Sequence, residues 1–239
     1  MDTNKLNKGH KTRLRNYAIS GARNYRHYLT GKIFKIICED GSETEVRFFA
    51  PDFKHLTGLC SDLDDNIFFE NCISGKFGIG NIETTQKYSW GTLRQKGMRI
   101  QNIHELLYKD DDKTLLLECL DTRTHIFPCA IRDDKNNVCV AFAGSLCKAR
   151  SLRKATSSFK ADTTKKIIAV LAKNDGDEKF SELVYISNVS NLYEKNSSLF
   201  DELEENIHVK FSKLIAKSDH ECDEHIDTDE NVDEYIDIN

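Results

Sequence analysis

The change of apolar spacing midway along the chain constrains the fold more than any other feature. Before residue 108, apolar side chains recur at the spacing of an amphipathic helix, as in Leu93, Ile100, Ile103 and Leu107. After the aspartates at 110–112, the chain changes to short strand-like runs that are separated by turn residues. Helices followed by a series of strands predict an α+β protein with a mainly antiparallel β-sheet.

A β-hairpin is expected within the helical part. The strand-like runs 32–38 and 43–49 flank Asp40-Gly41, a dipeptide that favours tight turns. We expect this hairpin and the N-terminal helices to pack on the sheet. The remaining pattern predicts helices over 12–29, 51–58, 67–75, 93–107 and 199–215, strands over 114–120, 125–131, 138–143, 166–172 and 182–187, and a long cationic connection over 144–164.

Acidic and basic residues are distributed unevenly along the chain. Residues 218–239 contain ten Asp or Glu and no Lys or Arg, so residues 1–217 hold 34 basic against 29 acidic residues. A basic body attracts polyanions, although an ordinary solvated surface has the same composition. The two prolines, Pro51 and Pro128, provide no proline-rich linker. We therefore expect a basic disordered N-terminus over 1–11, one α+β domain over 12–217 and a disordered acidic tail over 218–239.

The cysteines and the apolar runs indicate a reduced, cytoplasmic protein. Eight cysteines occur without a Cys-x-x-Cys pair, and several lie in apolar runs such as Val138-Cys139-Val140. This is the pattern of buried thiols, so we expect neither a metal nor another cofactor. The N-terminus is polar and basic, and no run reaches the length of a membrane span.

Two segments contain candidate functional residues. His55 follows a strand-like run in a short apolar helix, where it is either a proton carrier or a hydrogen-bonded core residue. The second segment, residues 148–160, has five basic and four hydroxyl residues in thirteen positions. Lys and Arg bind phosphate and hydroxyls donate to its oxygens, whereas the alternative is a flexible basic loop without a ligand.

The block Phe53-Lys54-His55-Leu56-Thr57-Gly58-Leu59 resembles a family signature, Phe-x-His-Leu-x-Gly-Leu. The family is the fourth phage-associated family of Barnase–EndoU–colicin–RelE-like nucleases, PBECR4. Further similarity lies in the helical stretch 98–106 and in Ser157-Ser158-Phe159-Lys160, so that the resemblance spans residues 12–188. It implies an α+β fold and a ribonuclease linked to phages, mobile elements or their conflicts with hosts.

The resemblance implies metal-independent RNA cleavage through the substrate's 2′-hydroxyl, with RNA, including tRNA, as the partner. On this interpretation His55 transfers a proton, Arg153 stabilises the phosphate and Ser157 positions it. The other candidate RNA-binding residues are Lys54, Lys148, Arg150, Lys154, Thr156 and Ser158. A second proton carrier is open among His27, His104 and His125, and Tyr88 or Trp90 is a candidate for base stacking.

Two other classes of function fit the same residues. One is a non-catalytic protein that binds nucleic acid or a host or defence protein. The other is a protein that binds or acts on a nucleotide-like ligand, which requires a deep apolar cleft with an aromatic wall. The orientation of His55, toward a basic groove or into the core, separates the catalytic class from the binding class.

Overall fold

The structure is a computed structural model that describes residues 4–108, 113–122, 124–156, 159–187, 192 and 195–223. Its helices are α1 (Lys8–Asn24), α2 (Asp52–Thr57), α3 (Asp65–Ser74), α4 (Trp90–Gln101) and α6 (Glu205–Asp223), with a π-helical turn at Tyr25–Leu29 and 3-10 turns at Ile79–Asn81, Ile103–Leu106 and Ser197–Glu202. Its strands are β1 (Lys32–Cys38), β2 (Glu43–Arg47), β3 (Thr114–Asp121), β4 (Ile126–Asp133), β5 (Val138–Ala143), β6 (Lys148–Lys154), β7 (Thr163–Asn174) and β8 (Glu182–Ile186). The α+β class is confirmed.

The sheet is a closed barrel, which corrects the expectation of a plain antiparallel sheet. Seven strands follow the order β1-β2-β6-β5-β4-β3-β7, and β7 pairs back with β1. Every pair is antiparallel except β2 and β6, which meet in parallel at Arg47 and Lys148. The twelve-residue β7 allows closure, because residues 163–166 pair with β3 and residues 167–174 pair with β1.

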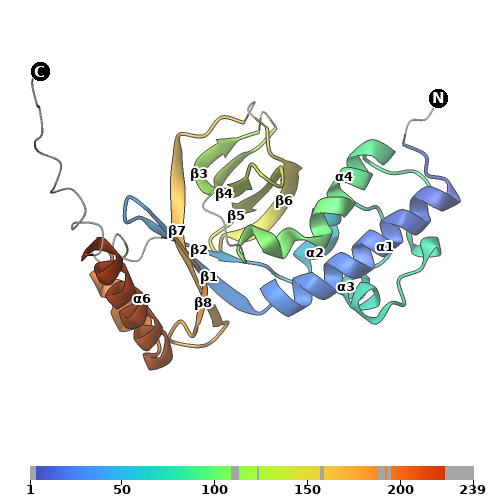
Figure 1. Ribbon diagram of the computed structural model, residues 1–239. Coiled ribbons are helices and arrows are strands. Elements are labelled where there is room, and N and C mark those ends of the chain that lie inside the picture. Colours follow the sequence, from blue (N-terminus) through green and yellow to red (C-terminus); the bar gives the residue numbers. More distant parts are fainter. Residues whose placement is uncertain are drawn as a thin grey trace, which may run out of the picture.

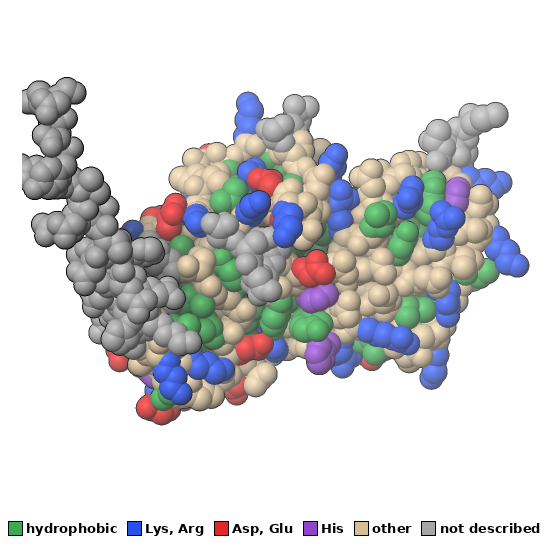
Figure 2. All heavy atoms as spheres, viewed as in Figure 1, with side chains coloured by type: hydrophobic (Ala, Val, Ile, Leu, Met, Phe, Trp, Pro, Cys, Tyr) green, Lys and Arg blue, Asp and Glu red, His purple; other side chains and the backbone are tan. Residues whose placement is uncertain are grey.

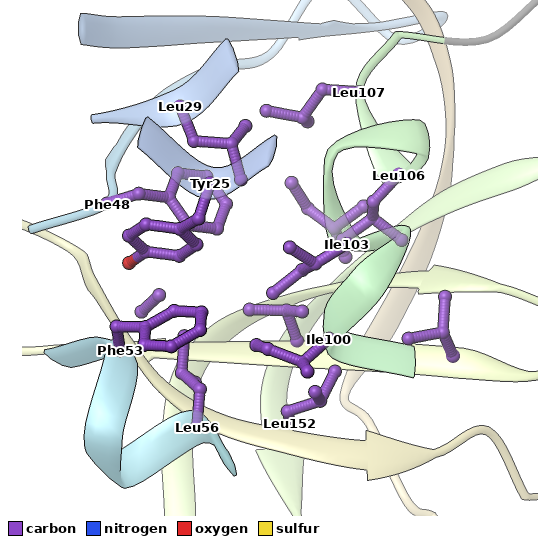
Figure 3. Packing of buried hydrophobic residues seen from close by; sticks show 14 of the residues in the cluster. Tyr25, Leu29, Phe48, Phe53, Leu56, Ile100, Ile103, Leu106, Leu107 and Leu152 are labelled. Carbon is purple, nitrogen blue, oxygen red and sulfur yellow. The ribbon is translucent and has the colours of Figure 1, made fainter. Parts of the chain in front are cut away.

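The helices lie on two sides of the barrel. Helices α1 to α4 form a layer at one end of it, and α6 lies on the opposite side, beyond β7 and β8 (Figure 1). The helical layer shares one buried cluster with the barrel, in which Leu56 of α2, Ile100 of α4 and Leu152 of β6 pack together (Figure 3). Because all three side chains are fully buried, their elements are fixed relative to one another.

The N-terminal segment is more ordered than the sequence predicts. Helix α1 begins at Lys8 and not at Thr12, because the Asn7 side chain caps it by accepting a hydrogen bond from the amide of His10 at 2.8 Å. Leu6 is buried just before the cap. Residues 4–11 are therefore held in place, and residues 1–3 lie outside the described part of the chain.

The predicted hairpin is confirmed, whereas the predicted cationic connection over 144–164 is wrong at residues 148–154 and 163–164, which belong to strands. Strands β1 and β2 pair antiparallel, with a register from Ile33 opposite Arg47 to Ile37 opposite Glu43. Residues 148–154, predicted as part of a loop, form strand β6 and pair with β5. The buried Ala149 and Leu152 supply the apolar side of this strand.

The helices predicted over 93–107 and 199–215 differ in extent from those in the structure. The helix expected over 93–107 ends at Gln101, and a 3-10 turn follows it. The helix expected over 199–215 divides into the 3-10 turn Ser197–Glu202 and α6, which reaches Asp223 because no Gly or Pro interrupts it. The sequence predicts a disordered acidic tail from residue 218, but the backbone is helical to Asp223, and residues 224–239 lie outside the described residues.

Candidate active site

A cleft of about 960 Å³ lies between the helical layer and the barrel. Helix α2 contributes His55, helix α4 contributes one of its faces, and β6 contributes most of its length. The lining residues are His55, Lys87, Tyr88, Thr92, Gln95, Lys96, Arg99, Thr124, His125, Phe127, Ala143, Arg150, Ser151, Leu152, Arg153, Lys154, Thr156 and Phe159. The cleft therefore brings together seven residues that the sequence proposed: His55, Tyr88, His125, Arg150, Arg153, Lys154 and Thr156.

His55 is presented to the cleft by a helix of six residues. Pro51 precedes this helix, and Gly58 ends it with a φ of +72°, a left-handed conformation that favours glycine. Phe53 and Leu56 are buried in the core, so the exposed His55 side chain lies on the opposite face of the helix. Partial burial lowers the pKa of His55, and the charges of Arg150 and Lys96 lower it further.

A β-bulge directs the cations of β6 into the cleft. Ala141 and Phe142 of β5 pair with Ser151 and Ala149, which leaves Arg150 as the extra residue. The consecutive residues Arg150 and Ser151 consequently both line the cleft. The guanidinium of Arg150 is held in position, because its Nη1 donates to Oδ1 of the buried Asp52 at 3.1 Å.

Arg153 is held by two contacts along the barrel wall. Its Nε donates to Oγ of Ser151 at 2.9 Å, and its guanidinium carbon lies 6.0 Å from the ring centre of Phe127. Among the described residues, no carboxylate forms an ion pair with Arg153. Its charge is thus available to an anionic ligand in the cleft.

Helix α4 supplies cleft residues that the sequence analysis missed. Thr92, Gln95, Lys96 and Arg99 share one helix face and line the cleft. The Lys96 ammonium donates to the carbonyl of Leu152 at 2.7 Å and lies over the ring of Tyr88. Burial, together with the charges of Arg153 and Arg99, lowers the pKa of Lys96 to about 8. The i, i+3, i+4, i+7 spacing of these polar residues is the signal that a helical projection would have found.

The charge of the cleft is one-sided. Its described lining includes six Lys or Arg and two His residues but no Asp or Glu. Lys and Arg side chains are spread over the barrel and the helical layer in this view, and some of them lie where the two meet (Figure 2). A concave surface of one charge attracts a polyanion, and the aromatic rings of Tyr88, Phe127 and Phe159 offer faces for stacking.

The structure places two predicted RNA-binding residues outside the cleft. Lys54 points away from it, because its ammonium donates to the carbonyl of Leu63 and pairs with Asp65 at 3.2 Å. Lys148 is at the opposite end of β6 from Lys154, beside the parallel contact with β2. The remaining predictions, Ser157 and Ser158, lie outside the described residues.

The three candidate proton carriers separate in the structure. His125 lines the cleft with His55, at the start of β4. His104 instead stacks on Tyr28, with ring centres 4.3 Å apart, and His27 contacts the edge of the same tyrosine. Of the two predicted stacking residues, Tyr88 lines the cleft, whereas Trp90 stacks on His10 at 4.1 Å.

In the part of the chain that the structure describes, no group of three or more His, Cys, Asp or Glu side chains is arranged to hold a metal ion. No helix there has both the length and the apolar character that crossing a membrane requires.

An α+β barrel with a cationic cleft defines a class of protein suited to a polyanionic substrate. A family model described as phage-Barnase-EndoU-ColicinE5/D-RelE like nuclease4 matches residues 20–188, more than half of the chain. The chain belongs to this family, PBECR4, which confirms the resemblance of the block at 53–59 and implies a nucleic-acid substrate. No curated protein and no solved structure matches the chain.

Proposed function

We propose that the protein is an endoribonuclease that cleaves RNA by attack of a 2′-hydroxyl and needs no metal ion. The observation that carries this proposal is the position of His55. Its imidazole lines a cleft with six basic residues, and its pKa is lowered by partial burial and by Arg150. A lowered pKa keeps His55 neutral near pH 7, which is the form that accepts a proton.

The residues of the cleft account for each step of this reaction. Neutral His55 accepts the proton of the 2′-hydroxyl as the new bond from its oxygen to phosphorus forms. Arg150, Arg153 and Lys96 stabilise the negative charge of the phosphorane, and His125 in its protonated form donates to the 5′-oxygen as the phosphorus–oxygen bond breaks. The products are a 2′,3′-cyclic phosphate and a free 5′-hydroxyl. The proposal of metal independence depends on these cationic and imidazole groups.

The aromatic residues of the cleft favour a single-stranded substrate. Tyr88 and Phe159 are half-buried and line the same hollow as the cations. Unpaired bases stack on such rings, while the bases of a duplex are already stacked on one another. Single-stranded loops of RNA, including those of tRNA, are therefore the substrates that we propose.

The wider setting of the activity is also part of this proposal. The family description connects these nucleases with phages. We accordingly propose a phage or mobile-element origin and action in the cytoplasm of a host cell. A host or defence protein stays a candidate partner.

Cleavage of total RNA and tRNA in EDTA, with the product ends mapped, tests the proposal. His55→Ala and Arg153→Ala are expected to abolish products that end in 2′,3′-cyclic phosphates. His27→Ala and Lys148→Ala are the matched controls, because His27 is exposed outside the cleft and Lys148 lies on β6 beyond it. RNA binding without cleavage would instead support the binding protein, and selective binding of a free nucleotide would support the nucleotide-ligand class.

A further inference from the structure

A second pocket, of about 240 Å³, lies beside the cleft at the C-terminal end of α4. The two hollows share Gln95 and Arg99, which are one helical turn apart on the same face of α4. The far wall of the pocket comes from β4, β5 and the turn between them, through Asp133 and Val138. A ligand can therefore extend from the cleft into this pocket across Arg99.

The end of α4 places a carboxylate in the pocket. Asn102 leaves the α-helical conformation, and the chain continues in the 3-10 turn Ile103–Leu106. Ile103 and Leu106 are buried, and a separation of three residues puts them on the same side of such a turn. The Glu105 side chain is therefore on a different side of the turn from Ile103 and Leu106, and it lines the pocket. Within the described residues, its side chain forms no hydrogen bond or ion pair.

Arg99 is fixed at the boundary between the two hollows. Its Nε donates to the carbonyl of Asn137 at 2.9 Å, and Asn137 sits in the β4–β5 turn with a φ of +57°. This bond ties α4 to the barrel and holds the guanidinium against both hollows. Its Nη groups form no hydrogen bond with another described residue, so these groups are free to donate to a ligand.

The two hollows differ in charge. The cleft has basic groups and no carboxylate in its described lining, whereas the pocket has Glu105 and Asp133 beside Arg99. A phosphate is attracted to the first and repelled by the carboxylates of the second. A ligand with two adjacent N–H donors can instead form two hydrogen bonds to one carboxylate. A ligand with two adjacent acceptors can bind a guanidinium in the same way.

We propose that this pocket binds a guanine base of the RNA whose backbone occupies the cleft, an inference that rests on the proposed function. Guanine has two adjacent N–H donors, N1 and N2, for the Glu105 carboxylate. Its O6 and N7 are the acceptors that Arg99 recognises. Met98 and Val138 contact the ring from the apolar side of the pocket. The enzyme is thus selective for guanosine in single-stranded RNA.

Cleavage of short RNAs that carry guanosine, inosine, 7-deazaguanosine or uridine at one position tests this inference. The wild type is expected to cleave next to guanosine in preference to uridine. Glu105→Gln should reduce the ratio of the two rates by roughly 5- to 150-fold, the value of one bidentate contact to a base. Inosine lacks the N2 amine and should be cleaved more slowly than guanosine by the wild type but not by Glu105→Gln.

The 7-deazaguanosine substrate probes Arg99 without a protein variant, because it lacks the N7 acceptor. Glu83→Gln is the matched control, since Glu83 is exposed elsewhere on the surface and should keep the preference. Equal cleavage at all bases, or an unchanged preference in Glu105→Gln, would overturn the inference.

Failure of the proposed function is distinguishable from failure of this pocket. If the wild type cleaves no RNA, calorimetric titration with guanosine and uridine 3′-monophosphates measures the pocket alone. Tighter binding of the guanosine nucleotide that is lost in Glu105→Gln supports the pocket, and equal binding of the two nucleotides overturns it.

Discussion

Asp52 and Arg150 join α2 to the β6 bulge, with Oδ1 accepting from Nη1 at 3.1 Å beside His55. The carboxylate belongs to a residue that is only 6% exposed, whereas the guanidinium reaches the cleft. This pair therefore fixes the distance between the helix that presents the proton carrier and the strand that presents the cations. Its loss should affect stability as well as chemistry.

Arg150→Ala is expected to destabilise the fold more than Arg153→Ala. The first change leaves the buried Asp52 carboxylate without its cation, which costs about 1–3 kcal/mol of unfolding free energy. The partial exposure of Arg150 places the effect at the lower end of this range. Arg153 donates only to a neighbouring hydroxyl among the described side chains. Urea unfolding at pH 7 measures both variants, and equal losses would contradict the structural role of the pair.

The pH dependence of cleavage should report the lowered pKa of His55. A general base acts in its neutral form and a general acid in its protonated form, so kcat/KM should follow a bell-shaped pH profile whose acidic limb has its midpoint below pH 6.5. Because the charge of Arg150 is one cause of the lowered pKa, Arg150→Ala should move this midpoint upward. The shift is partial, since burial is the larger cause.

NMR titration of the His55 ring measures the same change without depending on the rate. The His27 ring is the internal control, because it lies outside the cleft and should not respond to Arg150→Ala. A His55 pKa at or above 6.5 in the wild type would remove the electrostatic argument for its role as the base.

Local sequence signals were sufficient where the structure depends on neighbours in the chain. The Asp40-Gly41 turn predicted the β1–β2 hairpin, and Val138–Ala143 is a strand with the predicted bounds. Barrel closure was not predictable in this way. It depends on the pairing of β1 with β7, whose partners are far apart in the sequence, such as Ile33 and Lys173.

Strand β6 shows why part of the site was misjudged. A strand with one buried face normally alternates with a period of two, but Ala149 and Leu152 are three residues apart because Arg150 is bulged. The bulge therefore hid the two-residue alternation of buried side chains, and the basic residues of this segment led to the prediction of a loop. The composition nevertheless identified Arg150, Arg153 and Lys154 as cleft residues, since charge attracts phosphate whatever the backbone conformation.

Gly97 is expected to be essential for the packing of α4. A Cβ at this position would lie 2.5 Å from Cδ2 of Tyr17 in α1, so Gly97→Ala should destabilise the fold by about 1–3 kcal/mol. A Cβ at Gly91 in the same helix would have no neighbouring atom closer than 3.9 Å, so Gly91→Ala should stabilise the fold by about 0.5–1 kcal/mol. In thermal unfolding, Gly97→Ala should have a lower Tm than the wild type, and Gly91→Ala should have a higher one. A neutral Gly97→Ala would show that α1 and α4 can separate without cost.

Lys96 should make RNA binding depend on pH through the charge of the cleft. Its pKa of about 8 means that it is charged at pH 7 and neutral at pH 9.5. When one cation no longer neutralises a phosphate of single-stranded RNA, the slope of log affinity against log salt becomes smaller by about 0.7. The slope of the wild type should therefore fall by about this amount between pH 7 and pH 9.5, measured with 2′-O-methyl RNA, which cannot be cleaved.

Lys96→Met should show the smaller slope already at pH 7, and the pH-dependent change should disappear. Lys87→Met is the matched control, because Lys87 also lines the cleft and lies over the ring of Tyr88. This control should lower the slope at pH 7 and keep the change that Lys96 causes between pH 7 and pH 9.5. A wild-type slope that is constant over this range would mean that the Lys96 ammonium does not contact the phosphates, and that its bond to the Leu152 carbonyl is structural.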